Sequence, residues 1–173
     1  MRKLSSIMPV LVFLFLTLLA YPCRLLAGEY DVYRVIDGDT IKVDDGTKKL
    51  TVRLVGIDAP EVSHAKNEPG QPFSQSSTKH LAALVLNRTV DITSYGQDGY
   101  GRTLGEVFDD GRNINLEMIK AGLAEVYRGT PAPGQNLGPY WQAESEAREA
   151  KRGMWVLGDK YVSPRKWRRV MAE

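Results

Sequence analysis

The sequence predicts an α+β domain, mostly β, in which a barrel of five short strands carries about three helices. Three observations support this fold class. Short segments alternate apolar and polar residues with the period of two that is typical of half-buried strands. Turns that contain glycine separate several of these segments. Segments with helical spacing of apolar residues follow the third and the fifth predicted strand.

Three strands are expected between Tyr30 and Asp58. Asp45-Gly46 supplies the positive φ that a tight hairpin turn requires between the second and third strands. Gly56 marks a bulge or a close backbone approach, and Pro60 ends the third strand because it cannot donate to a sheet ladder. The expected ranges are 30–36, 39–44 and 50–58.

The rest of the chain supplies two further strands and three helices. The strands are expected at 89–93 and 103–108, and the helices at 74–86, 115–121 and 139–151. Gly122 is a typical stop for the second helix, and Pro139 can open the third because its missing N–H lies in the first turn. Five short strands with helices so placed are typical of an oligonucleotide-binding (OB) type of barrel, which closes to avoid exposed edges.

Charged side chains gather where the second and third strands begin and end. The hairpin turn sets Arg53 within about one residue of the position opposite Asp39, and neighbouring strands lie ~4.8 Å apart. Asp39 and Asp58 are hard oxygen ligands suited to Ca²⁺ or Mg²⁺. Arg53 offers a planar fork for a phosphate, and Glu61 can take a proton from water. These are the parts of a metal-assisted phosphodiester hydrolase, although solvated rim charges are the alternative that the hairpin alone leaves open.

A second stretch adds another arginine at a strand start. Arg102 follows Asp98-Gly99-Tyr100-Gly101 and precedes the fifth strand. Two arginines and a divalent metal would surround a phosphoryl group with positive charge, which is the electrostatic part of phosphoryl transfer. Tyr100 either stacks on a base or ribose, as aromatic side chains do in proteins that bind single strands, or packs within its own turn.

The chain resembles the thermonuclease (staphylococcal nuclease-like) family from about Tyr30 to Arg169. The matching stretches are IDGDT at 36–40, RLVGIDAPE at 53–61, DGYGR at 98–102, AGLA at 121–124 and KRGMW at 151–155. Several such sequence motifs in the right order identify a family far more specifically than any one of them does. The resemblance implies the same OB-type barrel and a nuclease activity.

The resemblance also implies roles for individual residues. It makes Arg53, Arg102 and Glu61 catalytic, and it makes Asp39, Asp58 and the backbone carbonyl of Ala59 ligands of Ca²⁺. It further suggests that Tyr127 reaches the nucleotide pocket, whereas packing in the core is the commoner fate of such a tyrosine. Two positions depart from the family pattern, because Ala59 stands in place of a threonine and Gly99 in place of a lysine. The implied substrate is DNA, RNA or both, single-stranded or denatured, cleaved by a monomer.

Residues 1–27 have the pattern of a secretory signal peptide, which leaves residues 28–173 as a single domain with a basic C-terminal tail. An uncleaved membrane anchor is the alternative, and export is the expected fate of the cleaved protein. The chain has 23 basic and 21 acidic residues, and the leader holds three of the basic ones and no acidic one. The remainder therefore has a net charge of 20 − 21 = −1, so nucleic acid is expected to be held locally at the site.

Two other functions are compatible with the pattern. The first is a catalytically inactive barrel that binds nucleic acid or protein, and the second is a membrane-tethered scaffold module. Loss of a site arginine, glutamate or aspartate would favour the first, but all five side chains are present. The basic tail at 163–169 is expected to be solvated, with contact to nucleic acid as the alternative.

Overall fold

A closed β-barrel forms the centre of the computed structural model, which describes residues 28–63 and 69–171. The main sheet has the order β3-β2-β1-β5-β6-β7, and a further pairing of β3 with β6 closes five strands into the barrel. This β3–β6 pair is parallel, and the other strand pairs of the sheet are antiparallel. The bounds are β1 (Gly28–Val35), β2 (Thr40–Asp44), β3 (Lys49–Leu54), β5 (Thr89–Gln97), β6 (Thr103–Asp109) and β7 (Arg112–Asn113). The predicted five-stranded barrel is confirmed, while the predicted leader lies outside the described residues.

The third strand is shorter than its sequence pattern indicates. It ends at Leu54, and a turn at Gly56, whose φ is +80°, separates it from β4 (Ile57–Asp58). β4 leaves the barrel to pair with β8 (Glu125–Val126), so that Asp58 lies opposite Glu125. Glycine is favoured at position 56 because this φ is rarely adopted by other residues.

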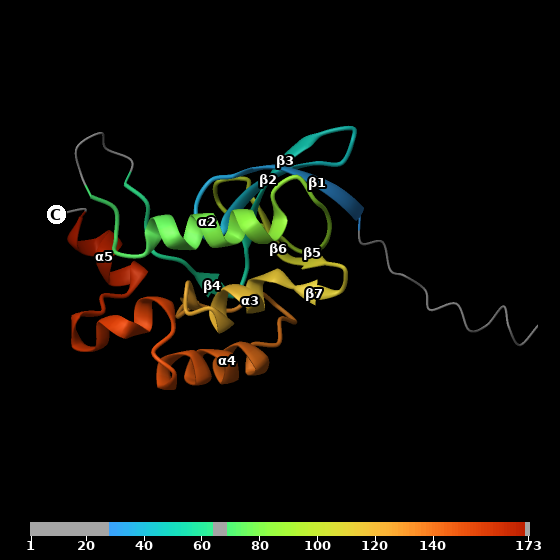
Figure 1. Ribbon diagram of the computed structural model, residues 1–173. Coiled ribbons are helices and arrows are strands. Elements are labelled where there is room, and N and C mark those ends of the chain that lie inside the picture. The colour runs from blue at the N-terminus through green and yellow to red at the C-terminus, as the bar shows by residue number, and fades with distance from the viewer. Residues whose placement is uncertain (1–27, 64–68, 172–173) are drawn as a thin grey trace, which may run out of the picture.

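The three predicted helices are present, and two further helical segments follow them. The predicted helices are α2 (Ser74–Val85), α3 (Ile114–Lys120) and α4 (Gly138–Glu149), each within two residues of the expected bounds. The 3₁₀ segment η1 (Gly153–Lys160) and α5 (Pro164–Val170) complete the fold. The tail that was expected to be solvated forms this last helix, most of whose side chains are exposed. The helix lies at the end of the molecule away from the start of β1 (Figure 1). Within 28–63 and 69–171, no helix is long and apolar enough to cross a membrane.

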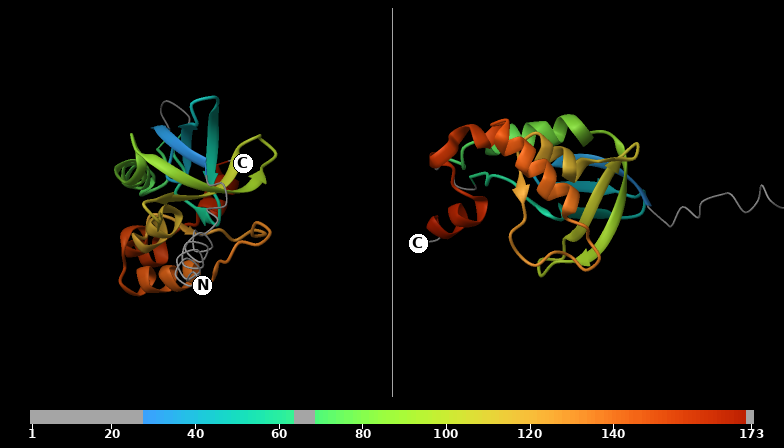
Figure 2. Two further views of the ribbon diagram at one scale, coloured as in Figure 1. Left: turned by 90° about the vertical axis from the view of Figure 1, so that its right-hand side faces the viewer. Right: turned by 90° about the horizontal axis from the view of Figure 1, so that it is seen from below.

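The helices pack on the barrel around one main core. α3 and α4 lie together against one side of the barrel, and α2 lies beside them (Figure 2). Strand residues facing inward alternate with exposed ones, as expected for a barrel. The fully buried side chains of this core include Val32, Ile41, Val43, Val52, Leu54, Leu81, Val85, Val107, Ile114, Met118 and Ile119.

A buried asparagine on α3 ties the closing seam of the barrel together. The side chain of Asn115 is fully buried and accepts a hydrogen bond from the Val107 amide (3.0 Å). It donates to the carbonyls of Val55 (2.9 Å) and Gly105 (3.1 Å). These carbonyls come from the segments on either side of the β3–β6 pairing. The Gly105 carbonyl also accepts a hydrogen bond from the Val55 amide (2.9 Å), so Asn115 adds side-chain hydrogen bonds to the backbone contact that closes the seam.

Replacing Asn115 with leucine is expected to destabilise the fold, because the Val107 amide and the Val55 carbonyl would lose this buried partner. An unsatisfied buried polar group costs roughly 1–3 kcal/mol, so we expect a loss of at least ~2 kcal/mol in the free energy of unfolding. Urea denaturation of wild type and variant measures the change. Asn136→Leu, in an exposed loop, is the control, and equal losses in the two variants would contradict the role of the seam.

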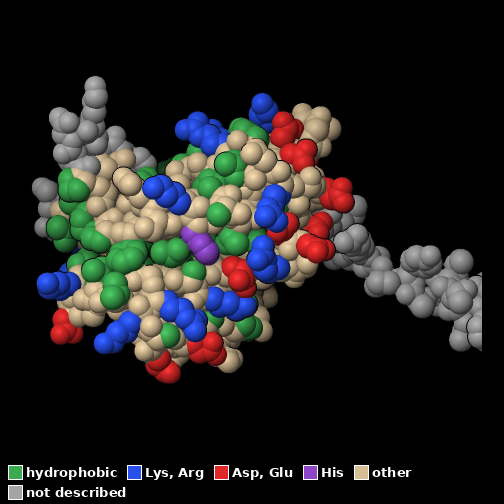
Figure 3. Space-filling view, in the orientation of Figure 1, with side chains coloured by type: hydrophobic (Ala, Val, Ile, Leu, Met, Phe, Trp, Pro, Cys, Tyr) green, Lys and Arg blue, Asp and Glu red, His purple; other side chains and the backbone are tan. Residues whose placement is uncertain are grey.

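Charge on the visible face of the molecule is mixed. Figure 3 shows basic side chains interspersed with acidic ones over the helices and the barrel. This agrees with the near-zero net charge calculated for residues 28–173. Binding of a polyanion would therefore depend on particular residues at a site and not on a broad positive field.

Candidate active site

The loop between β1 and β2 brings Asp39 against the second half of the predicted site. A Cβ added at Gly38 would lie 2.0 Å from Ser77 Oγ and 2.7 Å from the Ala59 Cβ, so only glycine fits there. The side chain of Asp37 accepts a hydrogen bond from the Asp39 amide (3.0 Å) and fixes the turn. This tight packing explains why an aspartate-glycine-aspartate sequence stands at the start of β2.

Asp39 contacts both of the segments that the sequence analysis placed near it. It is 2% exposed, and its Oδ2 accepts a hydrogen bond from the Ala59 amide (2.8 Å). Its Oδ1 accepts a hydrogen bond from Arg53 Nη1. Thr40 is the register partner of Arg53, so the expected offset of about one residue is confirmed. Asp39 lies just before β2. The alternation of side chains along that strand therefore does not prevent the carboxyl group of Asp39 from reaching Arg53.

Arg53 bridges the two aspartates that were predicted to hold a metal. One terminal nitrogen contacts Asp39, and Nη2 donates to Asp58 Oδ1 (3.0 Å). Asp58 is also 2% exposed, because β4 is buried under β8. Burial alone would lower the pKa of Arg53, but the carboxyl groups of Asp39 and Asp58 raise it above its usual value. The guanidinium therefore stays charged between two nearly buried carboxyl groups.

Glu61 joins this cluster through a residue that the sequence analysis did not single out. Arg168 of α5 donates through Nη1 to Glu61 Oε1 and to Asp58 Oδ1 (3.0 Å), and through Nη2 to Asp58 Oδ2 (2.8 Å). Its hydrogen bonds to Asp58 raise the pKa of Arg168. The structure thus connects Asp39, Arg53, Asp58 and Glu61 into one continuous network of contacts.

Arg102 directly precedes β6, the strand that pairs with β3, and lies outside this network. Its Nε donates to Asp98 Oδ2 (2.7 Å), and its side chain is 33% exposed. β6 runs parallel to β3 with Leu104 opposite Arg53. If the alternation of β6 is extended by one residue, Arg102 lies on the same barrel face as Arg53, displaced by two residues along the strand.

The two candidate substrate-binding tyrosines are exposed. Tyr100 is 89% exposed, and the guanidinium carbon of Arg102, in the same turn, lies 5.6 Å from the centre of its ring. Tyr127 is 39% exposed, and its amide donates to the Gly56 carbonyl (2.9 Å) just before β4. The alternative in which Tyr127 packs in the core is therefore wrong. Both rings are free to contact a ligand at the surface.

A buried glutamate was also missed. Glu125 is 2% exposed and lies opposite Asp58 in the β4–β8 pair. The Tyr161 hydroxyl donates to its Oε2 (2.7 Å), and burial raises its pKa. No local pattern marked Glu125, because its environment arises only when β8 pairs with β4.

The donor set is suitable for a hard divalent cation. Asp39 Oδ2 and Asp58 Oδ2 each accept one hydrogen bond from the described residues, and a carboxyl oxygen has two lone pairs. The Ala59 carbonyl, directly after Asp58, would be the third oxygen. Two carboxyl groups and a carbonyl fit the oxygen preference of Ca²⁺ or Mg²⁺. Within the described ranges no group of three or more His, Cys, Asp or Glu side chains forms a metal site, so a metal here would need the carbonyl or water as well.

The burial of Asp39 predicts a pH-dependent stability of the metal-free protein. Burial raises the pKa of Asp39 to about 8, although Arg53 lowers it. At this carboxyl group the folded state therefore binds more protons than the unfolded state between about pH 4, the usual aspartate pKa, and pH 8. Stability must fall as pH rises through this window, by at most ~1.4 kcal/mol for each pH unit from this group.

Urea unfolding with chelator, at several pH values from 5 to 9, measures this effect. Asp39→Asn carries no titrating group at this position, so its free energy of unfolding is expected to fall less steeply with pH than that of the wild type. The comparison cancels the contribution of the other carboxyl groups. Parallel curves for the two proteins would contradict a raised pKa at Asp39.

Comparison with known proteins agrees with this arrangement. Residues 51–156 match the family model described as staphylococcal nuclease homologue. The chain is 42% identical to a protein of Escherichia coli described as an uncharacterized endonuclease, over 79% of this chain and 82% of the relative. It is 38% identical to a Haemophilus influenzae protein of the same description, over 80% of this chain and 71% of the relative. It is 37% identical to a micrococcal nuclease of Shigella flexneri, over 81% of this chain and 80% of the relative. With the barrel closed as described and more than half of its residues matched by the model, the chain belongs to the staphylococcal nuclease homologue family.

Proposed function

We propose that this protein is a secreted, calcium-dependent nuclease that hydrolyses phosphodiester bonds of DNA, RNA or both. The observation that carries the proposal is the contact of Arg53 with both Asp39 and Asp58, in a network that also reaches Glu61. The similarity to proteins described as endonucleases and as a micrococcal nuclease supports the same reaction class.

In the proposed hydrolysis, some residues of the chain bind the phosphate and another handles the proton of the attacking water. The guanidinium of Arg53 binds a phosphate oxygen and neutralises the charge that grows in the transition state. Arg102, directly before the neighbouring strand β6, contacts the phosphate from a second direction once Asp98 releases it. Glu61 orients the attacking water or removes its proton. A metal held by Asp39, Asp58 and the Ala59 carbonyl would polarise the phosphate and lower the pKa of bound water.

The preferred substrate is proposed to be single-stranded or denatured nucleic acid. Tyr100 and Tyr127 are exposed aromatic residues, and bases that are free of a duplex can stack on such rings. The protein is proposed to act as a monomer, because the candidate site is assembled from one chain. Export after removal of residues 1–27 is part of the proposal, and the mass of the protein recovered outside the cytoplasm tests it.

Hydrolysis of heat-denatured DNA by the purified protein tests the activity. The assay is run with Ca²⁺, with Mg²⁺ and with chelator, and RNA is compared under the same conditions. Cleavage that requires Ca²⁺ and is lost in Glu61→Ala supports the proposal. Cleavage unaffected by this substitution would indicate a contaminant or a different site. A folded protein that binds nucleic acid without cleaving it would establish the inactive binding module instead.

A further inference from the structure

The backbone of Glu61 is held from the far end of the loop that follows it. The Gln71 amide donates to the Glu61 carbonyl (2.8 Å), and the Glu61 amide donates to Gln71 Oε1 (3.0 Å). Gln71 is 3% exposed, so water does not compete with these bonds. A reciprocal pair of this kind fixes both backbone groups of Glu61 and therefore the direction in which its side chain leaves the chain.

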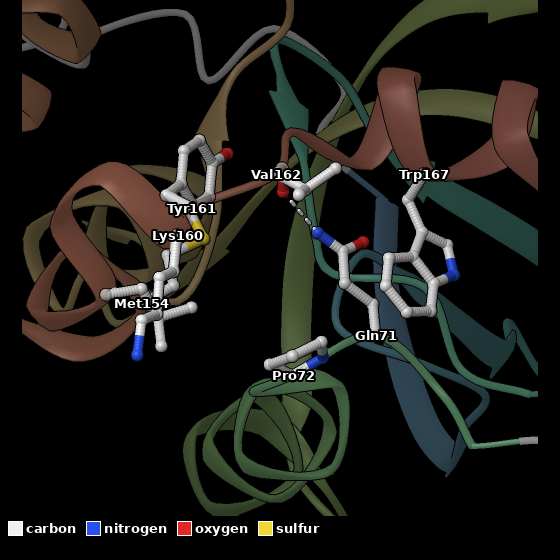
Figure 4. Close-up of a pocket in the computed structure, with 8 residues that line it drawn as sticks. Gln71, Pro72, Met154, Lys160, Tyr161, Val162 and Trp167 are labelled. Atoms are coloured by element: carbon white, nitrogen blue, oxygen red, sulfur yellow. Dashed lines mark hydrogen bonds between the residues drawn. The ribbon is translucent and has the colours of Figure 1, made fainter.

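The same glutamine also ties the C-terminal segment to the loop. Its Nε2 donates to the Val162 carbonyl (2.7 Å), and Figure 4 shows Trp167 of α5 beside Gln71 and Pro72. Ser163 then caps α5 by accepting a hydrogen bond from the Lys166 amide (3.2 Å). These contacts fix the position and the direction of α5 relative to Glu61 independently of the contacts that Arg168 makes.

Arg168, which lies on α5, contacts the side-chain carboxyl group of Glu61. Its two terminal nitrogens donate to both oxygens of Asp58, and such a bidentate contact fixes the plane of the guanidinium. Nη1 also donates to Glu61 Oε1. One carboxyl oxygen of Glu61 is therefore engaged by Arg168, while the other oxygen, Oε2, remains the atom through which Glu61 can contact a water.

We propose that Gln71 and Arg168 are positioning residues for Glu61, Gln71 through its backbone and Arg168 through Oε1. The C-terminal segment that contains Val162 and Arg168 then belongs to the active site, because it helps to position Glu61. This inference rests on the proposed nuclease function and extends it. The physical reason is geometric, because a group that orders or deprotonates a water must be held at a fixed distance and angle, and a third group often orients the base.

Kinetics of Arg168→Gln test the inference. The rate constant kcat on denatured DNA at saturating calcium is expected to fall ~10–100-fold, since a misplacement of about 1 Å can cost 10²-fold in rate. KM is expected to change less than kcat. Arg168→Lys, which keeps the positive charge but lacks the planar pair of nitrogens, is expected to restore part of kcat. Calorimetric titration with Ca²⁺ without nucleic acid is expected to show an affinity no weaker than that of the wild type.

Arg112→Gln is the matched control, because Arg112 is also a partly exposed arginine that pairs with an aspartate, at 45% exposure against 41% for Arg168. It lies on β7, outside the candidate site, and is expected to keep the wild-type kcat. The decisive comparison adds Arg168→Gln to Glu61→Gln. If Arg168 acts through Glu61, the second substitution lowers the residual rate no further, because residues that act as one unit are not additive.

Three outcomes would overturn the inference. They are an unchanged kcat in Arg168→Gln, an equal loss in the wild-type and Glu61→Gln backgrounds, and a loss that follows weakened calcium binding. A gain in calcium affinity accompanied by a gain in rate would instead make Arg168 a competitor of the metal. Hydrogen exchange of the Glu61 amide separates this test from the nuclease proposal, because Gln71→Met is expected to speed that exchange whether or not the protein cleaves nucleic acid.

Discussion

Arg53→Lys is expected to lower kcat for denatured DNA by ~10²–10³-fold, the usual cost of removing one preorganised donor to a developing oxyanion. Lysine keeps the positive charge but has neither the plane nor the paired nitrogens with which Arg53 contacts Asp39 and Asp58. The loss would therefore come from the geometry of phosphate binding and not from net charge. Initial rates at saturating calcium measure it.

Arg34→Lys is the control for this prediction, because Arg34 is an exposed arginine on β1 that takes no part in the candidate site. It should keep the wild-type rate within about twofold, as surface substitutions away from special features usually do. Circular dichroism and thermal unfolding show whether Arg53→Lys remains folded. A variant that is folded and keeps more than a third of the rate would remove Arg53 from the catalytic machinery.

The pairing of Asp39 with Arg53 could be predicted from the sequence because both residues flank one hairpin. Register within a hairpin follows from its turn and from alternation, and these signals are local. Gly46 has a φ of +82°, as the predicted turn requires. Asp58 was expected at the end of the third strand, but that strand ends at Leu54, and Asp58 lies on β4, which pairs with the distant β8. Local chemistry was therefore enough to pair Asp39 with Arg53, while the place of Asp58 also depends on a nonlocal contact.

The contributions of Arg168 and Gln71 could not be predicted because they depend on distant segments. Arg168 lies 110 residues from Asp58 in the chain, and the β3–β6 pairing that closes the barrel is likewise nonlocal. The basic sequence around Trp167 was interpreted as a solvated tail. One local signal was available, because Ser163-Pro164 is a typical helix start with a capping serine followed by proline. It indicates a helix but says nothing of where that helix docks.

The last prediction concerns Asp58, the carboxyl group that Arg53 and Arg168 share. Asp58→Asn is expected to weaken calcium binding at least ~10–100-fold, the loss that even an indirect partner of a metal typically causes. The amide also replaces one acceptor oxygen by a donor, whereas Asp58 accepts three hydrogen bonds from the two guanidinium groups. At least one guanidinium nitrogen must therefore lose its acceptor at residue 58.

Two measurements separate these effects in Asp58→Asn. Calorimetry without nucleic acid gives the calcium affinity, and kcat at saturating calcium gives what remains once the metal is bound. We expect kcat to stay at least ~10-fold below the wild type, because the positions of Arg53 and Arg168 depend on the charge of Asp58 as well.

Asp110→Asn, in an exposed turn at a φ of +50° that asparagine readily adopts, should match the wild type in both measurements. Full recovery of kcat at high calcium would limit Asp58 to metal binding, and an unchanged affinity would exclude it from the metal site. A loss in both would mean that one buried carboxyl group holds the metal and orients both arginines.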